Sequence, residues 1–171
     1  MITLKSKNAN YSINVPTDKS ELDGETISQL LSNITLPKHY CVIALRYKVS
    51  LFELVFSQRS SSQKKPMVSV VPLMGKVNKD DVTFEVNPGD RVLIDGADIE
   101  RGTHLGVNTA ITVSNITNYI VSDEELIKKC LNREKKDSTD DIYCLEFKIV
   151  PVNALHGKVF GDIIDPFVVK E

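Results

Sequence analysis

The sequence contains no tryptophan, and its aromatic residues are few: five tyrosines and six phenylalanines in 171 residues. Proteins that bind glycans on a β-sandwich usually stack the sugar faces on exposed aromatic side chains. The low aromatic content therefore argues against a glycan-binding β-sandwich.

Cysteine is also scarce. Cys41, Cys130 and Cys144 are an odd number, and none of them forms a Cys-x-x-Cys pair. Each has apolar neighbours, as in the Tyr-Cys-Val-Ile segment at residues 40–43. We expect buried free thiols in a reducing compartment, rather than a disulfide framework or a zinc site.

Long apolar runs and an excess of one charge are missing as well. No apolar run approaches the roughly 20 residues that span a membrane, and residues 1–15 alternate polar and apolar side chains where a signal peptide has an apolar core. The 21 basic and 23 acidic residues leave a formal charge of −2, so no broad basic face for phosphates is indicated. We expect neither a membrane nor a direct nucleic-acid partner.

The motifs of common enzyme chemistry are absent. The sequence has no GxSxG, which marks a nucleophilic serine, and neither GxxxxGK[ST] nor GxGxxG, which bind phosphates. We therefore assign no catalytic, cofactor-binding or metal-binding residue and no cofactor, and we predict that the chain is not an enzyme.

What the sequence does contain is apolar alternation, most clearly in residues 82–117. The alternation at 82–86 has the period of a half-buried strand. Residues 87–90, Asn-Pro-Gly-Asp, favour a type II turn, because proline sets φ of the second position and glycine accepts the positive φ of the third. Further strands are predicted at 92–94 and, after a glycine-spaced loop, at 111–113.

Strands are predicted on both sides of this stretch. Residues 1–15 have the pattern of an edge strand, and 40–49 place an apolar face at the odd positions. Residues 51–56 place their apolar side chains at the even positions instead, so 40–56 forms either a tight hairpin or one strand that changes face at a bulge at residues 49–50. Pro72 limits 67–77 to an edge or bent strand, and 142–152 predicts a further strand.

Two short helices are predicted. Ile27, Leu30, Leu31 and Ile34 fall on one helical stripe, with Asp23 as the N-cap and Pro37 beyond the end. In the second helix Ser122 is the expected N-cap of a capping box. Its apolar stripe consists of Leu126, Ile127, Cys130 and Leu131.

These elements predict a mainly β protein with two short helices, arranged as a β-sandwich or an open β-barrel in a single domain, residues 1–171. A polar loop or arm at 57–66 and a charged loop at 132–141 contain almost no apolar side chains. The C-terminal tail, 153–171, combines glycine breaks with short apolar pieces, and either closes the sheet or docks on a neighbouring subunit. A homo-oligomer is thus one alternative.

Two segments contain side chains of the kinds that bind metal ions. Acidic residues gather between Asp80 and Glu100, but residues 95–100 supply too few ligands for a calcium loop, and we interpret them as turn residues with solvated carboxylates. Residues 102–108, Gly-Thr-His-Leu-Gly-Val-Asn, loosely resemble the second motif of cupins, which implies a β-barrel metalloenzyme using His104. The preceding proline, the glycine spacing and an upstream HxH are missing, and His39 and His156 are distant in sequence. Whether His104 or the acidic cluster binds an ion is left open.

A second resemblance covers most of the chain. Residues 86–115 (VNPGDRVLIDGADIERGTHLGVNTAITVSN), the polar arm at 57–66 and the apolar C-terminal tail together are similar to head auxiliary proteins of crAss-like phages of gut Bacteroidetes. The excess of lysine over arginine and the abundant Asn and Ile suit the AT-rich genomes of such phages. The resemblance implies a non-enzymatic structural or decoration protein in the virion, assembled in the host cytoplasm, that binds the major capsid protein and other virion proteins. A head–tail connector or tail component is an alternative of the same class.

Overall fold

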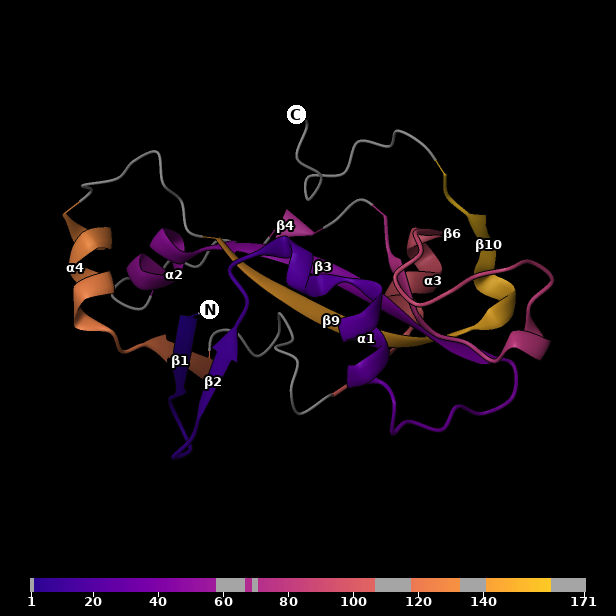
Figure 1. Ribbon diagram of the computed structural model, residues 1–171, viewed down its shortest axis with the longest axis horizontal. Helices are drawn as coiled ribbons and strands as arrows, with labels where there is room; N and C mark the ends of the chain where they lie inside the picture. The colour runs from indigo at the N-terminus through magenta and orange to yellow at the C-terminus, as the bar shows by residue number, and fades with distance from the viewer. Residues whose placement is uncertain (1, 58–66, 69–70, 107–117, 133–140, 161–171) are drawn as a thin grey trace.

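The computed structural model describes residues 2–57, 67–68, 71–106, 118–132 and 141–160 (Figure 1). The fold is mainly β, as predicted, and three sheets are present. None of the sheets formed by the described residues closes into a barrel. None of the helices in these residues is long and apolar enough to cross a membrane.

The centre of the fold is one long antiparallel ladder. Strands β3 (Tyr40–Ser50) and β9 (Asp141–Pro151) pair along their full lengths, from Tyr40 opposite Pro151 to Ser50 opposite Asp141. Figure 1 shows these two strands running along the longest axis of the molecule. The strands predicted at 40–49 and 142–152 are confirmed.

Shorter strands extend this sheet at both edges. Strands β4 (Met67–Val68) and β5 (Leu73–Lys76) pair with β3, and β7 (Thr103–Leu105) pairs with β9. The segment 67–77, predicted as an edge or bent strand, thus supplies two short strands at the edge of the sheet, and Pro72 directly precedes the second. Proline has no N–H to donate to a ladder.

Residues 41–45 of β3 are buried on both faces of the sheet, whereas residues 46–50 are half-buried. The sequence pattern predicted one apolar face for residues 40–49. On one face Val42 and Ala44 pack with Phe147 and with helix α1 (Gly24–Leu30). On the other face Cys41, Ile43 and Leu45 pack in a second cluster. The partners in the second cluster are Met74, Val86, Val92, Val150 and Leu155.

Two small sheets flank the ladder. Strands β1 (Ile2–Ser6), β2 (Ser12–Val15) and β8 (Tyr119–Val121) form a sheet in the order β2-β1-β8. The predicted edge strand of residues 1–15 is therefore a hairpin of two strands. Strands β6 (Val92–Ile94) and β10 (Leu155–Lys158) form a two-stranded ribbon.

The described residues also form four α-helices and three short 3-10 turns. Besides α1, these are α2 (Leu51–Ser57), α3 (Gly96–Arg101) and α4 (Glu124–Leu131). Helices α2 and α4 lie at one end of the molecule, and α3 lies towards the other end (Figure 1). The 3-10 turns are Lys19–Leu22, Lys79–Asp81 and Val152–Ala154.

The strand predicted at 51–56 is wrong, because this segment is the helix α2. Leu51, Leu54 and Val55 are buried at the spacing i, i+3, i+4, whereas Phe52 is 37% exposed. The Ser50 hydroxyl accepts a hydrogen bond from the backbone N–H of Glu53 at 3.4 Å, which supports the first helical turn. The predicted hairpin or bulge near residues 49–50 is replaced by a direct strand-to-helix junction.

The strand predicted at 82–86 is also wrong, since the segment belongs to none of the described strands. Its side chains nevertheless alternate as expected: Val82, Phe84 and Val86 pack against the core, and Thr83 and Glu85 are exposed. The pattern predicted burial correctly but not a hydrogen-bonded ladder.

The turn that follows is confirmed. The N–H of Asp90 donates to the carbonyl of Asn87 at 3.0 Å, and Gly89 has φ of +90°. This is the positive φ that the third position of a type II turn requires. The next strand, predicted at 92–94, is β6, and the strand predicted at 111–113 lies outside the described residues.

Both predicted helices exist, with shifted ends. Asp23 caps α1 by accepting from the N–H of Thr26 at 2.9 Å, as predicted, but the helix stops at Leu30. The predicted N-cap Ser122 is wrong by one residue. Asp123 caps α4 by accepting from the N–H groups of Glu125 and Leu126, because its carboxylate is a stronger acceptor than a hydroxyl.

The structure describes only part of the predicted polar arm, charged loop and C-terminal tail. Ser57 ends α2, and the rest of the polar arm, 58–66, lies outside the described residues. The same holds for 133–140 in the charged loop and for 161–171 in the C-terminal tail. The part of the tail at 155–158 is β10, which closes the small ribbon with β6.

Candidate functional site

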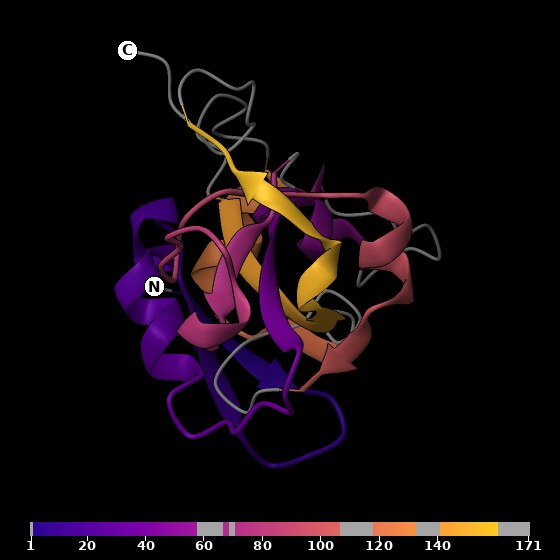
Figure 2. The same ribbon diagram turned by 90° about the vertical axis from the view of Figure 1, so that its right-hand side faces the viewer.

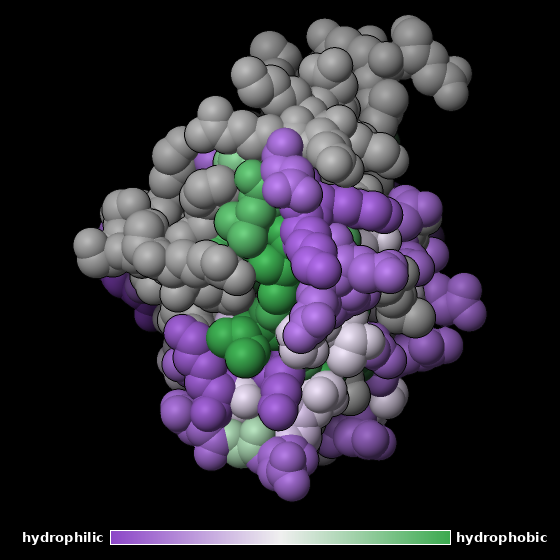
Figure 3. All heavy atoms as spheres, turned by 90° about the vertical axis from the view of Figure 1, so that its left-hand side faces the viewer, coloured by the Kyte–Doolittle hydropathy of each residue, from purple (hydrophilic) through white to green (hydrophobic). Residues whose placement is uncertain are grey.

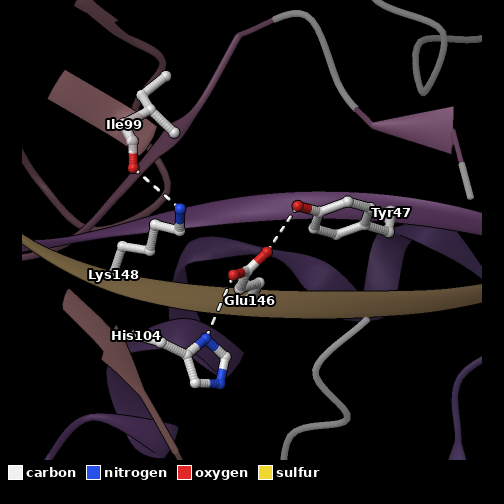
Figure 4. Close-up of polar contacts among 5 residues, drawn as sticks. All are labelled: Tyr47, Ile99, His104, Glu146 and Lys148. Atoms are coloured by element: carbon white, nitrogen blue, oxygen red, sulfur yellow. Dashed lines mark hydrogen bonds and ion pairs between the residues drawn. The ribbon is translucent and has the colours of Figure 1, made fainter. Parts of the chain in front are cut away.

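The carboxylate of Glu146, in the middle of β9, contacts polar side chains from two neighbouring strands. One of its oxygens accepts a hydrogen bond from the Tyr47 hydroxyl at 2.6 Å, and the other lies 3.2 Å from Nδ1 of His104. Figure 4 shows the three side chains, which come from β3, β9 and β7, converging on this carboxylate. The Glu146 side chain is only 14% exposed.

Strand register explains the convergence. Glu146 lies opposite Leu45 and His104 opposite Lys148, so Glu146 is the diagonal neighbour of both Tyr47 and His104 on one face of the sheet. Diagonal neighbours on a sheet lie within reach of long and aromatic side chains. The period-two pattern of residues 142–152 predicted that Glu146 and Lys148 share a face, but it did not predict the partners.

Lys148, on the same face of β9 as Glu146, contacts the helix α3. Its Nζ donates to the backbone carbonyl of Ile99 at 2.9 Å (Figure 4). A charged donor thus satisfies a carbonyl near the C-terminal end of α3, where the helix dipole favours a cation.

The surroundings of Tyr47 keep its hydroxyl protonated. Burial, and then the hydrogen bond to Glu146 with its negative charge, raise the pKa of the Tyr47 hydroxyl well above its usual value of 10.0. Tyr47 therefore remains a hydrogen-bond donor over the range in which proteins are stable.

The pair of His104 and Glu146 resembles the histidine and orienting carboxylate of a hydrolase. In Figure 4 the second ring nitrogen of His104 points away from Glu146. Nucleophilic catalysis also needs a hydroxyl or thiol beside the imidazole. Cys41 and Cys144 do not supply it, because they are buried in the core and burial raises the pKa of each thiol to about 12.

The three histidines are each paired with a different carboxylate. His39 lies 3.8 Å from Asp81, His104 lies 3.2 Å from Glu146, and the Nε2 of His156 lies 3.2 Å from Asp95. In the described part of the chain His104 belongs to no group of three close metal-ligating side chains. The ligand set that the cupin resemblance implies is therefore not assembled by these residues.

The acidic residues between 80 and 100 are spread over several places. Asp81 accepts from the N–H of His39 at 3.1 Å. Asp90 accepts from the N–H of Asn87 at 2.8 Å and forms an ion pair with Lys158 at 3.0 Å. Asp81 and Asp90 lie in turns, as predicted, but the prediction of solvated carboxylates is wrong for them, because their side chains are only 11% and 26% exposed and are engaged by these contacts.

Asp95 and Asp98 differ from the other acidic residues because His156 joins them. One ligand atom from each of the three side chains lies within 4.8 Å of the others. Figure 2 looks at this end of the molecule, where β10 crosses in front of the long sheet and α3 lies at one side. His156 is distant in sequence from both aspartates, and nothing in the sequence indicates that β10 pairs with β6.

Comparisons of the chain with protein-family models, with curated proteins and with solved structures found no match.

Proposed function

We propose that this chain is a non-enzymatic structural protein of a tailed-phage virion, an auxiliary or decoration protein that binds the major capsid protein. The proposal starts from the similarity of residues 86–115, the arm at 57–66 and the C-terminal tail to head auxiliary proteins of crAss-like phages. In this role the exterior of the fold is the working part.

The observation that carries the proposal is the long ladder of β3 and β9, in which residues 41–45 of β3 are buried and pack in clusters on both faces. Each strand is eleven residues long, and close-packed side chains on both sides resist deformation. A stiff spine of this kind suits a protein that transmits contacts between capsid subunits.

Apolar side chains at the two ends of the spine supply candidate contact surfaces. At one end Figure 3 shows apolar residues gathered between polar ones; Phe52 of α2 is 37% exposed there, and the stripe of α4 is only partly buried. At the other end Leu93 is 56% exposed and Phe160 is 76% exposed. In a symmetric shell a modest contact repeats many times, so small apolar surfaces suffice.

Co-sedimentation with assembled capsids tests the proposal. Purified chain should pellet with shells of the major capsid protein encoded in the same genome, and binding should saturate at a fixed ratio of chain to capsid subunit. Failure to pellet with the shells at saturating concentrations would overturn the auxiliary role. Binding to portal or tail complexes in place of shells would identify a connector or tail component.

Two substitutions locate the contact. Phe52→Glu and Leu93→Glu each place a charge on an exposed apolar position at opposite ends of the spine, so one serves as the control for the other. The variant at the contacting end should bind capsids at least about tenfold more weakly, because a charge would be desolvated in the interface. Deletion of the arm at residues 58–66 should also weaken binding without unfolding the chain.

The metalloenzyme alternative has a separate test. Stoichiometric iron, zinc or manganese in the purified protein that disappears in His104→Ala would favour a cupin-like enzyme over the structural role. Unchanged metal content in His104→Ala counts against it.

A further inference from the structure

The strands β6 and β10 bring together three metal-ligating side chains that are far apart in the sequence. Asp95 follows β6, Asp98 lies in the first turn of α3, and His156 lies in β10, 61 residues after Asp95. Their ligand atoms all lie within 4.8 Å of one another.

An irregularity in the ribbon places the histidine. Leu155 pairs with Ile94 and Gly157 pairs with Leu93, so His156 is the extra residue at a shift in register. Such bulges turn a side chain away from the regular alternation of the strand. Gly157 has φ of +155°, which a glycine adopts without a steric penalty.

The side chain of Asp95 behaves differently from the equivalent residues elsewhere in the chain. Asp23, Asp95 and Asp123 are the N-cap residues of α1, α3 and α4. The carboxylates of Asp23 and Asp123 accept hydrogen bonds from the N–H groups of their own helices, whereas that of Asp95 makes no such bond. Its carboxylate instead lies 3.2 Å from Nε2 of His156.

The spacing of these atoms suits an ion. With bonds of about 2.1 Å to nitrogen and oxygen, two ligands of a tetrahedral zinc ion lie about 3.4 Å apart. The 3.2 Å between His156 and Asp95 is close to this value, and the ligand atom of Asp98 lies within 4.8 Å of both. A divalent cation would also offset the repulsion between two neighbouring carboxylates.

The donor set selects the class of metal. Calcium and magnesium prefer oxygen ligands alone, whereas imidazole together with carboxylate is typical of zinc and similar transition metals. From these observations we propose that Asp95, Asp98 and His156 form a binding site for one zinc-class divalent ion. Exposed fractions of 71% for Asp95 and 49% for His156 leave the remaining coordination positions open to water. The site is independent of the proposed structural role and of His104.

Isothermal titration calorimetry of the untagged full chain with Zn²⁺ tests the site. We expect saturation at one ion per chain, and no saturable binding of Ca²⁺ at the same concentrations. His156→Ala and Asp98→Asn should each weaken Zn²⁺ binding by at least about tenfold, because each removes one of three ligands. His39→Ala is the matched control, since His39 is also exposed and paired with an aspartate, and it should leave the affinity unchanged.

A spectroscopic measurement on the unaltered chain complements the variants. The electron paramagnetic resonance spectrum of one equivalent of Cu²⁺ should show coupling to one imidazole nitrogen, and this coupling should be lost in His156→Ala. The proposal is overturned if wild-type protein shows no saturable Zn²⁺ binding. It is also overturned if His156→Ala binds as well as wild type, or if His39→Ala loses the site.

Discussion

The long ladder of β3 and β9 and the small ribbon of β6 and β10 represent two ways of using β-structure. The ladder pairs eleven residues of each strand in unbroken register, and its central residues are buried on both faces. The ribbon pairs three residues on each strand with one shift in register, and Leu93 in its middle is 56% exposed. The ladder holds the fold together, while the ribbon can present side chains to a ligand.

Polar groups follow the same division. In the ladder Glu146 is mostly buried and its two oxygens are engaged by Tyr47 and His104. In the ribbon Asp95 and His156 are exposed and contact one another. A buried carboxylate must be satisfied within the fold, whereas an exposed cluster can exchange its solvent for an ion.

The ribbon is attached to the ladder through β5 and the turn at residues 87–90. The N–H of Met74 donates to the carbonyl of Asp90 at 2.7 Å, and the N–H of Gly89 donates to the carbonyl of Met74 at 2.8 Å. An isolated bridge pairs Leu73 with Arg91. The turn is therefore one of the connections between the two regions, together with the short 3-10 turn that joins β9 to β10.

The largest expected difference between the two regions is the loss in free energy of unfolding when a side chain is truncated to alanine. Phe147 in β9 is fully buried, so Phe147→Ala should lower the free energy of unfolding by about 3–5 kcal/mol. Leu93→Ala in the ribbon should change it by less than about 0.5 kcal/mol. Urea denaturation measures both free energies of unfolding. Equal losses in the two variants would contradict the distinction between a buried ladder and an exposed ribbon.

One methyl group added at Gly89, in the turn at residues 87–90, should lower the stability of the fold. Gly89→Ala forces a positive φ of 90° on alanine, and its Cβ would lie 2.6 Å from the Cα of Gly24. We expect a loss of roughly 1–3 kcal/mol. Gly96→Ala is the control, since an added Cβ there meets nothing within 4 Å. Comparable losses for the two variants in the same urea assay would show that the contact with Gly24 is unimportant.

Alkaline pH should lower the free energy of unfolding through two buried cysteines of the ladder. The pKa of Cys41 in β3 and of Cys144 in β9 is raised by burial from 9.0 to about 12. The unfolded chain loses these protons first, so this contribution is complete below pH 9 and is lost as the pH rises from 9 to 12. Each thiol adds a slope of about 1.4 kcal/mol per pH unit.

Unfolding free energies of wild type and Cys144→Ala between pH 8 and pH 10.5, with reductant present, measure this slope. The variant should be less stable throughout, but its stability should fall less steeply. An identical slope in the two proteins would exclude Cys144 as a source of the alkaline effect.

The smallest effect is expected at the helix caps. Asp23→Ala removes an acceptor from the first turn of α1 and should lower the melting temperature by a few degrees. The hydrogen bonds to Thr26 lower the pKa of Asp23 below 3.8. The stabilisation is therefore present above pH 3.8 and disappears as the pH falls through the lowered pKa.

Asp95→Ala is the matched comparison, since Asp95 is the N-cap of α3 but makes no capping hydrogen bond. In metal-free buffer it should leave the melting temperature unchanged within about one degree. A loss as large as that of Asp23→Ala would show that Asp95 caps the helix in solution, which weakens the case for the metal site. Differential scanning calorimetry compares the two variants directly.

Local sequence patterns predicted the parts whose cause is local. The strands at 40–49 and 142–152 followed from long apolar alternation, and the turn at 87–90 followed from proline and glycine at defined positions. The helix α2 was missed because six residues rich in leucine and phenylalanine satisfy a period of 2 and a period of 3.6 about equally well. The exposure of Phe52 and the cap from Ser50 distinguish the two only in the folded chain.

The candidate sites were less predictable than the strands. Glu146 and Lys148 were placed correctly on one face, but the partners Tyr47 and His104 come from neighbouring strands that are distant in sequence. The cluster of Asp95, Asp98 and His156 likewise depends on the pairing of β6 with β10. Sequence spacing within one segment could not reveal a ligand 61 residues away.

Composition and periodicity by themselves determined that this chain is mainly β, where two of the four described α-helices lie, and where the turn at residues 87–90 lies. Only the tertiary structure decided which strands pair, that the central sheet is covered on both sides, and which polar side chains meet. Backbone hydrogen bonds are nearly the same for any two strands. The choice of partner is therefore made by side-chain packing between distant segments, which no local pattern contains.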